Sequence, residues 1–150
     1  MRDLELFYDI VSPYSYLGFE VIRRYRARWD LNLIYRPFFL GGVHKEVGNS
    51  APINVPAKAK YMFADLRRAS EHCQVPLTMP TNFPVFTLST QRFLIAIERD
   101  WPDHLEALTS ILFERFWCRD EDVSSPDVLI DACYEVGFVE LVEPYFQGGG

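Results

Sequence analysis

The chain opens with a strand, a helix and a second strand, and this order constrains its fold more than any other feature. Residues 4–11 are rich in aromatic and branched side chains, as is typical of a strand. Residues 14–28 carry apolar side chains at helical spacing, and residues 31–40 alternate apolar with polar ones. Two strands joined by such a helix form a βαβ unit, so we expect parallel strands and a right-handed crossover.

Ser12 and Pro13 separate the first strand from the helix. Serine is a favoured helix cap because its hydroxyl accepts a bond from a free backbone N–H, and proline fits the first helical position because no N–H is needed there. The same pair recurs at Ser125 and Pro126, so an ordinary cap is one interpretation. A binding site is the other, because free N–H groups and the helix dipole favour an anion at this end.

The pattern changes after residue 40. Residues 41–57 contain three glycines and two prolines and are predicted to form a long loop, of a kind that is usually functional or disordered. Helices are expected at 58–73, 88–100, 103–118 and from Ser125 to near Gly137, with a proline-rich connector at 75–85. Nothing after residue 40 predicts a third strand. The sequence therefore indicates an α/β chain in which a βαβ unit is followed by a helical block.

Composition excludes several classes of function. The net charge of −6 disfavours nucleic acid as a partner, since DNA-binding domains present a basic face. No apolar run approaches the ~18 residues of a membrane span, and the N-terminus shows no targeting segment. The three cysteines lie far apart, which suggests free, mostly buried thiols in a reducing compartment. No spacing of histidines and cysteines predicts a metal site.

The turn at Ser12 suggests a particular chemistry. Thioredoxin-like redox proteins carry a CxxC pair at the start of this helix, where the local field lowers a thiol pKa. The four residues at this position are Ser12-Pro13-Tyr14-Ser15, so the site has no sulfur for a dithiol–disulfide cycle. A hydroxyl can still donate a hydrogen bond to a thiolate that a substrate brings, and glutathione is such a substrate.

Residues 7–20, FYDIVSPYSYLGFE, closely resemble the opening of kappa-class glutathione transferases. Further matches follow in the same order, and the resemblance spans roughly residues 4–140: Arg36-Pro37, Gly41-Gly42, Gly48-Asn49 with Pro52, Pro56-Ala57-Lys58, Tyr61-Met62, Asp65-Leu66, Arg92-Phe93-Leu94, Phe116-Trp117 and Arg119-Asp120-Glu121-Asp122. The resemblance implies a thioredoxin-like domain interrupted by an inserted all-helical domain, and conjugation of glutathione to electrophiles. The related bacterial 2-hydroxychromene-2-carboxylate isomerases use glutathione for a double-bond isomerisation.

The resemblance also implies roles for individual residues. Ser12 matches the catalytic serine that holds the glutathione sulfur, and Asn49 and Lys58 match glutathione contacts, while Tyr14 and Ser15 are candidates to support Ser12. The residues themselves leave alternatives open. Lys58 near a helix start is unfavourable beside the dipole unless an anion binds there, but it is equally a solvated lysine. Asn49, which follows a glycine, could equally be a turn residue. Helical spacing favours Tyr14 as a core residue.

The same resemblance sets the expected organisation. We expect a thioredoxin-like βαβ unit and active-site loop at 1–57, a helical insertion domain at 58–140 and a tail at 141–150. The C-terminal thioredoxin half of the family is expected to be missing, which would impair activity. Glutathione and a small electrophile or peroxide are the expected partners, in a homodimer, without metal, in mitochondria or peroxisomes. An isomerase and a non-catalytic fragment that binds partners or dimerises remain as alternatives.

Overall fold

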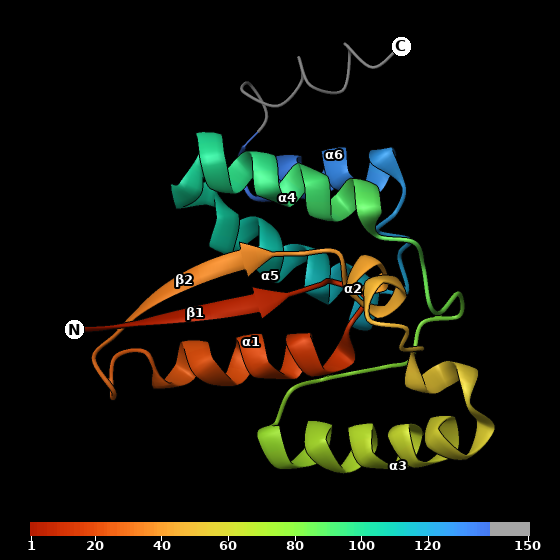
Figure 1. Ribbon diagram of the computed structural model, residues 1–150. Helices are drawn as coiled ribbons and strands as arrows, with labels where there is room; N and C mark the ends of the chain where they lie inside the picture. Colours follow the sequence, from red (N-terminus) through yellow and green to blue (C-terminus); the bar gives the residue numbers. More distant parts are fainter. Residues whose placement is uncertain (139–150) are drawn as a thin grey trace.

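The computed structural model describes residues 1–138 and confirms the βαβ unit (Figure 1). Strand β1 (Arg2–Tyr8) leads into helix α1 (Pro13–Tyr25), which is followed by strand β2 (Leu31–Pro37). The two strands are parallel and pair from Arg2 with Leu31 to Tyr8 with Pro37. They form a two-stranded sheet within the described residues. The predicted tail at 141–150 lies outside them.

The helices after β2 follow the predicted order, with one correction. They are α2 (Leu40–Glu46), the short 3-10 helix η1 (Pro52–Asn54), α3 (Pro56–Cys73), α4 (Leu88–Asp100), α5 (Pro102–Trp117) and α6 (Pro126–Glu135). The last four are confirmed to within two residues. The uninterrupted loop at 41–57 is wrong, because α2 and η1 occupy much of it, and the second strand ends at Pro37 rather than at residue 40.

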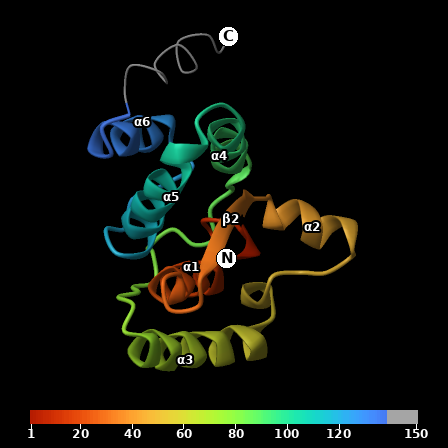
Figure 2. The same ribbon diagram turned by 90° about the vertical axis from the view of Figure 1, so that its left-hand side faces the viewer.

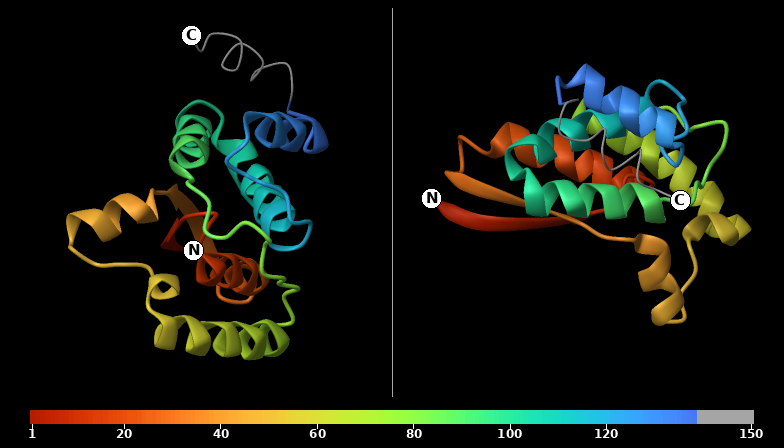
Figure 3. Two further views of the ribbon diagram at one scale, coloured as in Figure 1. Left: turned by 90° about the vertical axis from the view of Figure 1, so that its right-hand side faces the viewer. Right: turned by 90° about the horizontal axis from the view of Figure 1, so that it is seen from above.

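The sheet lies between helices from both parts of the chain. Helix α1 packs against β1 and α3, whereas α4 packs against β2 and α5, and α6 packs against α5. Figures 2 and 3 show α1 and α5 on the same side of the sheet, with α2 projecting on the other side. Where the sheet meets α1 and α5, four aromatic rings pack together, with centroids 5.3–6.5 Å apart: Tyr8, Phe19, Tyr35 and Phe113.

A single buried cluster joins the βαβ unit to the helical block. It contains Tyr8 and Phe19 from the first part and Leu94, Leu108 and Trp117 from the second. The division into domains at residue 57 stays a prediction. In residues 1–138, no helix combines the length and the apolar character required to cross a bilayer.

The cysteine prediction is confirmed in one respect and wrong in another. All three thiols are free, as expected. Only Cys133 is buried, whereas Cys73 is partly exposed and Cys118 is exposed. The reason is that Cys118 follows the last residue of α5, where the buried face of that helix has ended.

Candidate active site

Ser12 caps helix α1, as the sequence predicts. Its Oγ accepts a hydrogen bond from the backbone N–H of Ser15 at 3.1 Å, and Pro13 occupies the first turn of the helix. The backbone N–H of Ser12 donates to the carbonyl of Asp9 at 2.9 Å. Because the cap uses only a lone pair of the hydroxyl, the Ser12 proton stays available to a ligand. Ser12 is half-buried and lines a pocket.

The backbone beneath Ser12 is held by side chains from the helical block. We call residues 8–12 the site floor. The Gln91 side-chain amide donates to the carbonyls of Tyr8 and Phe38, both at 2.9 Å, and its oxygen accepts from the N–H of Ile10 at 3.3 Å. The indole N–H of Trp117 donates to the carbonyl of Ile10 at 2.9 Å. Helices α4 and α5 therefore satisfy the polar backbone that continues beyond β1.

One buried carboxylate joins three sides of the site. Asp9 is fully buried and accepts hydrogen bonds from the N–H of Val11 at 3.2 Å, the N–H of Leu40 at 2.9 Å and the Thr87 hydroxyl at 2.8 Å. All three donor residues line the pocket. Burial raises the pKa of Asp9 above its ordinary value, and these hydrogen bonds oppose the shift.

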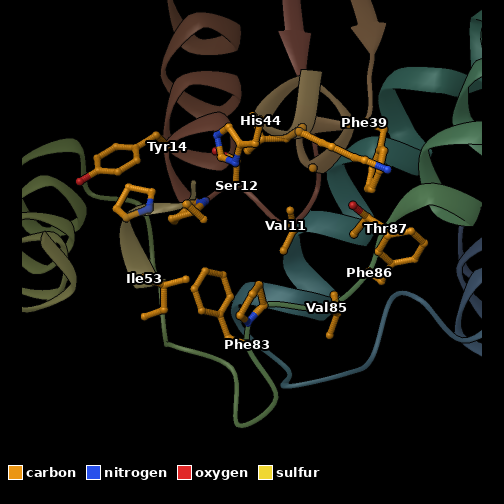
Figure 4. A pocket seen from close by; sticks show the side chains of 18 of the residues that line it. Val11, Ser12, Tyr14, Phe39, His44, Ile53, Phe83, Val85, Phe86 and Thr87 are labelled. Carbon is orange, nitrogen blue, oxygen red and sulfur yellow. The ribbon is translucent and has the colours of Figure 1, made fainter. Parts of the chain in front are cut away.

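The pocket above the floor has a volume of about 570 Å³, within the range of small-molecule sites (Figure 4). We call residues 39–54 the site wall, since α2 and η1 supply one side of the pocket. The opposite side comes from the connector before α4. The main lining residues are Val11, Ser12, Tyr14, Phe39, Leu40, His44, Lys45, Ile53, Phe83, Val85, Phe86 and Thr87.

The aromatic part of the wall depends on two glycines. The Phe39 ring lies over Gly41 and Gly42, so that a Cβ at Gly41 would fall 2.8 Å from Cζ of the ring and one at Gly42 would fall 3.0 Å from Cδ1. Phe39 also meets Phe86 edge to face, with centroids 5.1 Å apart and planes at 76°. The pocket is therefore largely apolar on the sides away from Ser12.

The structure brings together only part of the predicted site. Ser12 and Tyr14 line the pocket, and Ser15 supports Ser12 through its backbone N–H. Asn49 and Lys58 are exposed and do not line it. The Asn49 side-chain oxygen instead accepts from the N–H of Ser50 at 2.8 Å. The role of Asn49 and Lys58 as glutathione contacts stays a prediction.

The interpretation of Tyr14 as a core residue is wrong. Tyr14 is 46% exposed, and its hydroxyl donates to Asp65 at 2.8 Å. The bond connects the first turn of α1 to α3. Desolvation and the hydrogen bond to Asp65 raise the pKa of Tyr14 to about 12, so the phenol is protonated near neutral pH. The residue is exposed because its side chain extends toward Asp65 of α3 and not into the core.

Two basic residues of the pocket were not predicted. His44 and Lys45 line it from the last turn of α2. The only signal for them was the length of the segment at 41–57, which indicated function without naming a residue. The lining residues from Phe83 to Thr87 gave no signal at all, since they follow Ser12 by about 70 positions. Within residues 1–138, no cluster of three or more His, Cys, Asp or Glu side chains could hold a metal ion.

A parallel βαβ unit whose first helix begins at a polar, pocket-lining residue is the arrangement expected of a thioredoxin-like domain. In agreement, residues 3–144 match the model of the DSBA-like thioredoxin domain, and the chain belongs to that family.

Relatives of known activity are similar to most of this chain. Human glutathione S-transferase kappa 1 is 39% identical over 141 residues, which cover 91% of this chain and 62% of that protein. The chain thus spans about 62% of the length of this relative. The 2-hydroxychromene-2-carboxylate isomerase of Sphingobium xenophagum is 28% identical over 138 residues, covering 91% and 69%. A solved 2-hydroxychromene-2-carboxylate isomerase shares the fold, with a TM-score of 0.82 at 17% identity over 99% of this chain and 72% of that one.

Proposed function

We propose that this protein is a glutathione-dependent enzyme, with Ser12 as the residue that stabilises the glutathione thiolate. The observation that carries the proposal is the position of the Ser12 hydroxyl, which lies at the positive end of α1 and lines a largely apolar pocket. This hydroxyl caps the helix with a lone pair, so its proton is free to donate to a ligand. The similarity to kappa-class transferases and to isomerases that act on an aromatic compound supports glutathione as the thiol and a small apolar molecule as the second substrate.

The energetics of this role are modest. Lowering a thiol pKa by two units requires about 2.7 kcal/mol of preference for the anion. A charge-assisted hydrogen bond from Ser12 contributes part of that, and the N-terminus of α1 contributes more because its dipole favours negative charge. The thiolate then attacks an electrophilic carbon. The apolar walls limit access of water, which strengthens both interactions.

Transfer to an electrophile is the activity we favour, because the relative of highest identity reported above is a transferase. The isomerase activity is the second candidate, and turnover of 2-hydroxychromene-2-carboxylate would distinguish it. A homodimer, and a place in mitochondria or peroxisomes, are further proposals that rest on the family resemblance alone.

Retention on immobilised glutathione tests the proposal. We expect wild-type protein to be retained and to be eluted by free glutathione, and Ser12→Ala to be retained weakly. Ser12→Asp keeps a helix cap but places a negative charge beside the thiolate, so it should also bind weakly. Ser125→Ala alters the other Ser-Pro pair, at the start of α6, and should behave as wild type. Equal retention of all four proteins, or of none, would contradict the proposed role of Ser12.

A further inference from the structure

The His44 side chain lines the pocket and makes no hydrogen bond or ion pair with the described residues. It belongs to the last turn of α2, is half-buried, and lines the same pocket as Ser12. Figure 4 shows its imidazole at the Ser12 end of that pocket. Among the described residues, its side chain has no hydrogen-bond or ion-pair partner. The ring is therefore available to a ligand.

The charges around His44 favour an oxygen that carries negative charge. The chain has 21 acidic and 15 basic residues, yet within the described part no acidic side chain lines the pocket, while Lys45, the next residue of α2 after His44, does line it. In an apolar pocket the interaction of a cation or an N–H donor with an anion is much stronger than in water. This end of the pocket is thus suited to stabilise an oxyanion, although the protein as a whole is acidic.

The rest of the pocket favours a flat aromatic group. Phe39 and Phe86 meet edge to face, and Phe83 adds a third ring to the lining. The position of the Phe39 ring requires that Gly41 lack a side chain. Aromatic rings prefer such offset and edge-to-face neighbours, which stabilise a bound ring beyond the effect of its burial.

We propose that the pocket accepts an aromatic α,β-unsaturated carbonyl compound and that His44 donates a proton to its carbonyl oxygen during addition of glutathione. This inference rests on the proposed function, because glutathione supplies the nucleophile. In this arrangement the sulfur lies at Ser12, the aromatic ring lies against Phe39 and Phe86, and the carbonyl between them meets His44.

The bonds and protons of this step balance. Glutathione first loses its thiol proton to solvent. The thiolate forms a C–S bond to the β-carbon, the C=C π bond breaks, and its electron pair moves through the α-carbon to the carbonyl oxygen. His44 gives its ring proton to that oxygen, producing an enol that relaxes to the ketone in water. Solvent then returns a proton to the imidazole.

Two electrophiles separate this role from a general effect on glutathione. The first is trans-4-phenyl-3-buten-2-one, in which addition creates an enolate oxygen. The second is benzyl chloride, in which the same thiolate displaces chloride and no oxyanion forms. We expect His44→Leu to lower kcat/KM for the enone about 100-fold, the usual scale for loss of a proton donor, and to change that for benzyl chloride less than 3-fold. Val43→Ala, on the exposed side of α2, is the matched control.

His44→Gln should recover part of the enone activity, because its amide can donate a hydrogen bond to the oxyanion although it cannot transfer the proton. An equal loss with both electrophiles would overturn the inference and assign His44 to the thiol instead. No loss with either would overturn it as well.

Binding of 4-nitrophenolate, an aromatic oxyanion, provides a measurement that does not depend on glutathione. We expect wild type to bind it at least 10-fold more tightly than His44→Leu does, and Ser12→Ala to bind it as wild type does. If glutathione is neither bound nor conjugated, the proposed function fails, and 4-nitrophenolate alone decides the inference. Equal binding by wild type and His44→Leu would then overturn it.

Discussion

The site floor and the site wall face the same pocket but are held in different ways. Tyr8, Asp9 and Ile10 of the floor are fully buried, and their polar groups are bonded to side chains of α4, α5 and the segment before α4. Helices α2 and η1 of the wall contain no buried residue, and the residue that precedes each of them gives no side-chain cap. The backbone at Ser12 is thus fixed to the core, whereas the wall is attached mainly at its ends.

This difference implies unequal local stability. Segments with few buried contacts open with a small free energy, while a buried, bonded segment opens only when the whole domain unfolds. Substitutions that release the floor should therefore lower global stability, and substitutions in the wall should change ligand binding with little effect on unfolding.

Gln91→Leu should destabilise the protein most. It leaves the Phe38 carbonyl and the Ile10 N–H without a partner, whereas the Tyr8 carbonyl keeps the hydrogen bond that the N–H of Phe38 donates at 3.0 Å. Each unsatisfied buried group costs about 1–3 kcal/mol, so we expect a loss of about 3 kcal/mol or more in the free energy of unfolding, measured by urea denaturation. Arg92→Leu, an exposed neighbour on α4, is the control and should change stability by less than about 0.5 kcal/mol. A loss no larger than that of the control would mean that α4 does not hold the floor.

Asp9→Asn should have the next largest effect, and the effect should depend on pH. An amide cannot accept all three hydrogen bonds, so we expect a loss of about 2 kcal/mol at acidic pH. The pKa of Asp9 is raised in the folded protein, so its contribution is complete below the ordinary value of about 3.9 and is lost as pH rises through the raised value. The advantage of wild type should therefore shrink as pH increases from 4 to 8. An advantage that grows over this range would contradict the assignment.

Gly41→Ala tests the wall. The new methyl group would meet the end of the Phe39 ring at 2.8 Å, and the ring can swing aside because it is the far end of a side chain. We expect a change in unfolding free energy below about 1 kcal/mol but weaker binding of aromatic ligands, by about 5-fold, as the ring leaves Phe86. Unchanged binding of benzyl chloride or 4-nitrophenolate would show that Phe39 does not shape the pocket.

Tyr14→Phe should have the smallest effect. It removes the hydrogen bond to Asp65 but keeps the ring. Because the pair is largely exposed, we expect a loss of about 0.5 kcal/mol, measured by thermal unfolding. A loss above about 2 kcal/mol would indicate that the contact of α1 with α3 is as important as the floor.

The sequence predicts the parts of the fold that depend on local signals. The strands, α1 and the four long helices have clear periodicity, and several begin with proline, so their limits are near those observed. Ser12 could be identified because the cap and the family resemblance agree. Helix α2 could not be predicted from the sequence, because Gly41 and Gly42 indicate a loop. The start of α2 is held by Asp9, which is 31 residues earlier in the chain.

The same limit explains the residues of the site that sequence analysis missed. Gln91, Thr87 and Trp117 act on the floor across about 80–110 positions, and no local pattern reports such a contact. His44 could not be placed because its segment was interpreted as a loop. Tyr14 was interpreted as a core residue from helical spacing, which does not show that its position in the first turn faces α3.

Titration of bound glutathione measures whether Ser12 stabilises the thiolate, since the thiolate absorbs in the ultraviolet and the thiol does not. The absorbance of the complex would be recorded against pH for wild type and Ser12→Ala, with each free protein subtracted to remove Cys73, Cys118 and Cys133. We predict a glutathione pKa about two units below its value in solution with wild type, and a return of at least one unit toward that value, or about 1.4 kcal/mol, with Ser12→Ala. The same lowered pKa in both complexes would show that the Ser12 hydroxyl does not stabilise the thiolate.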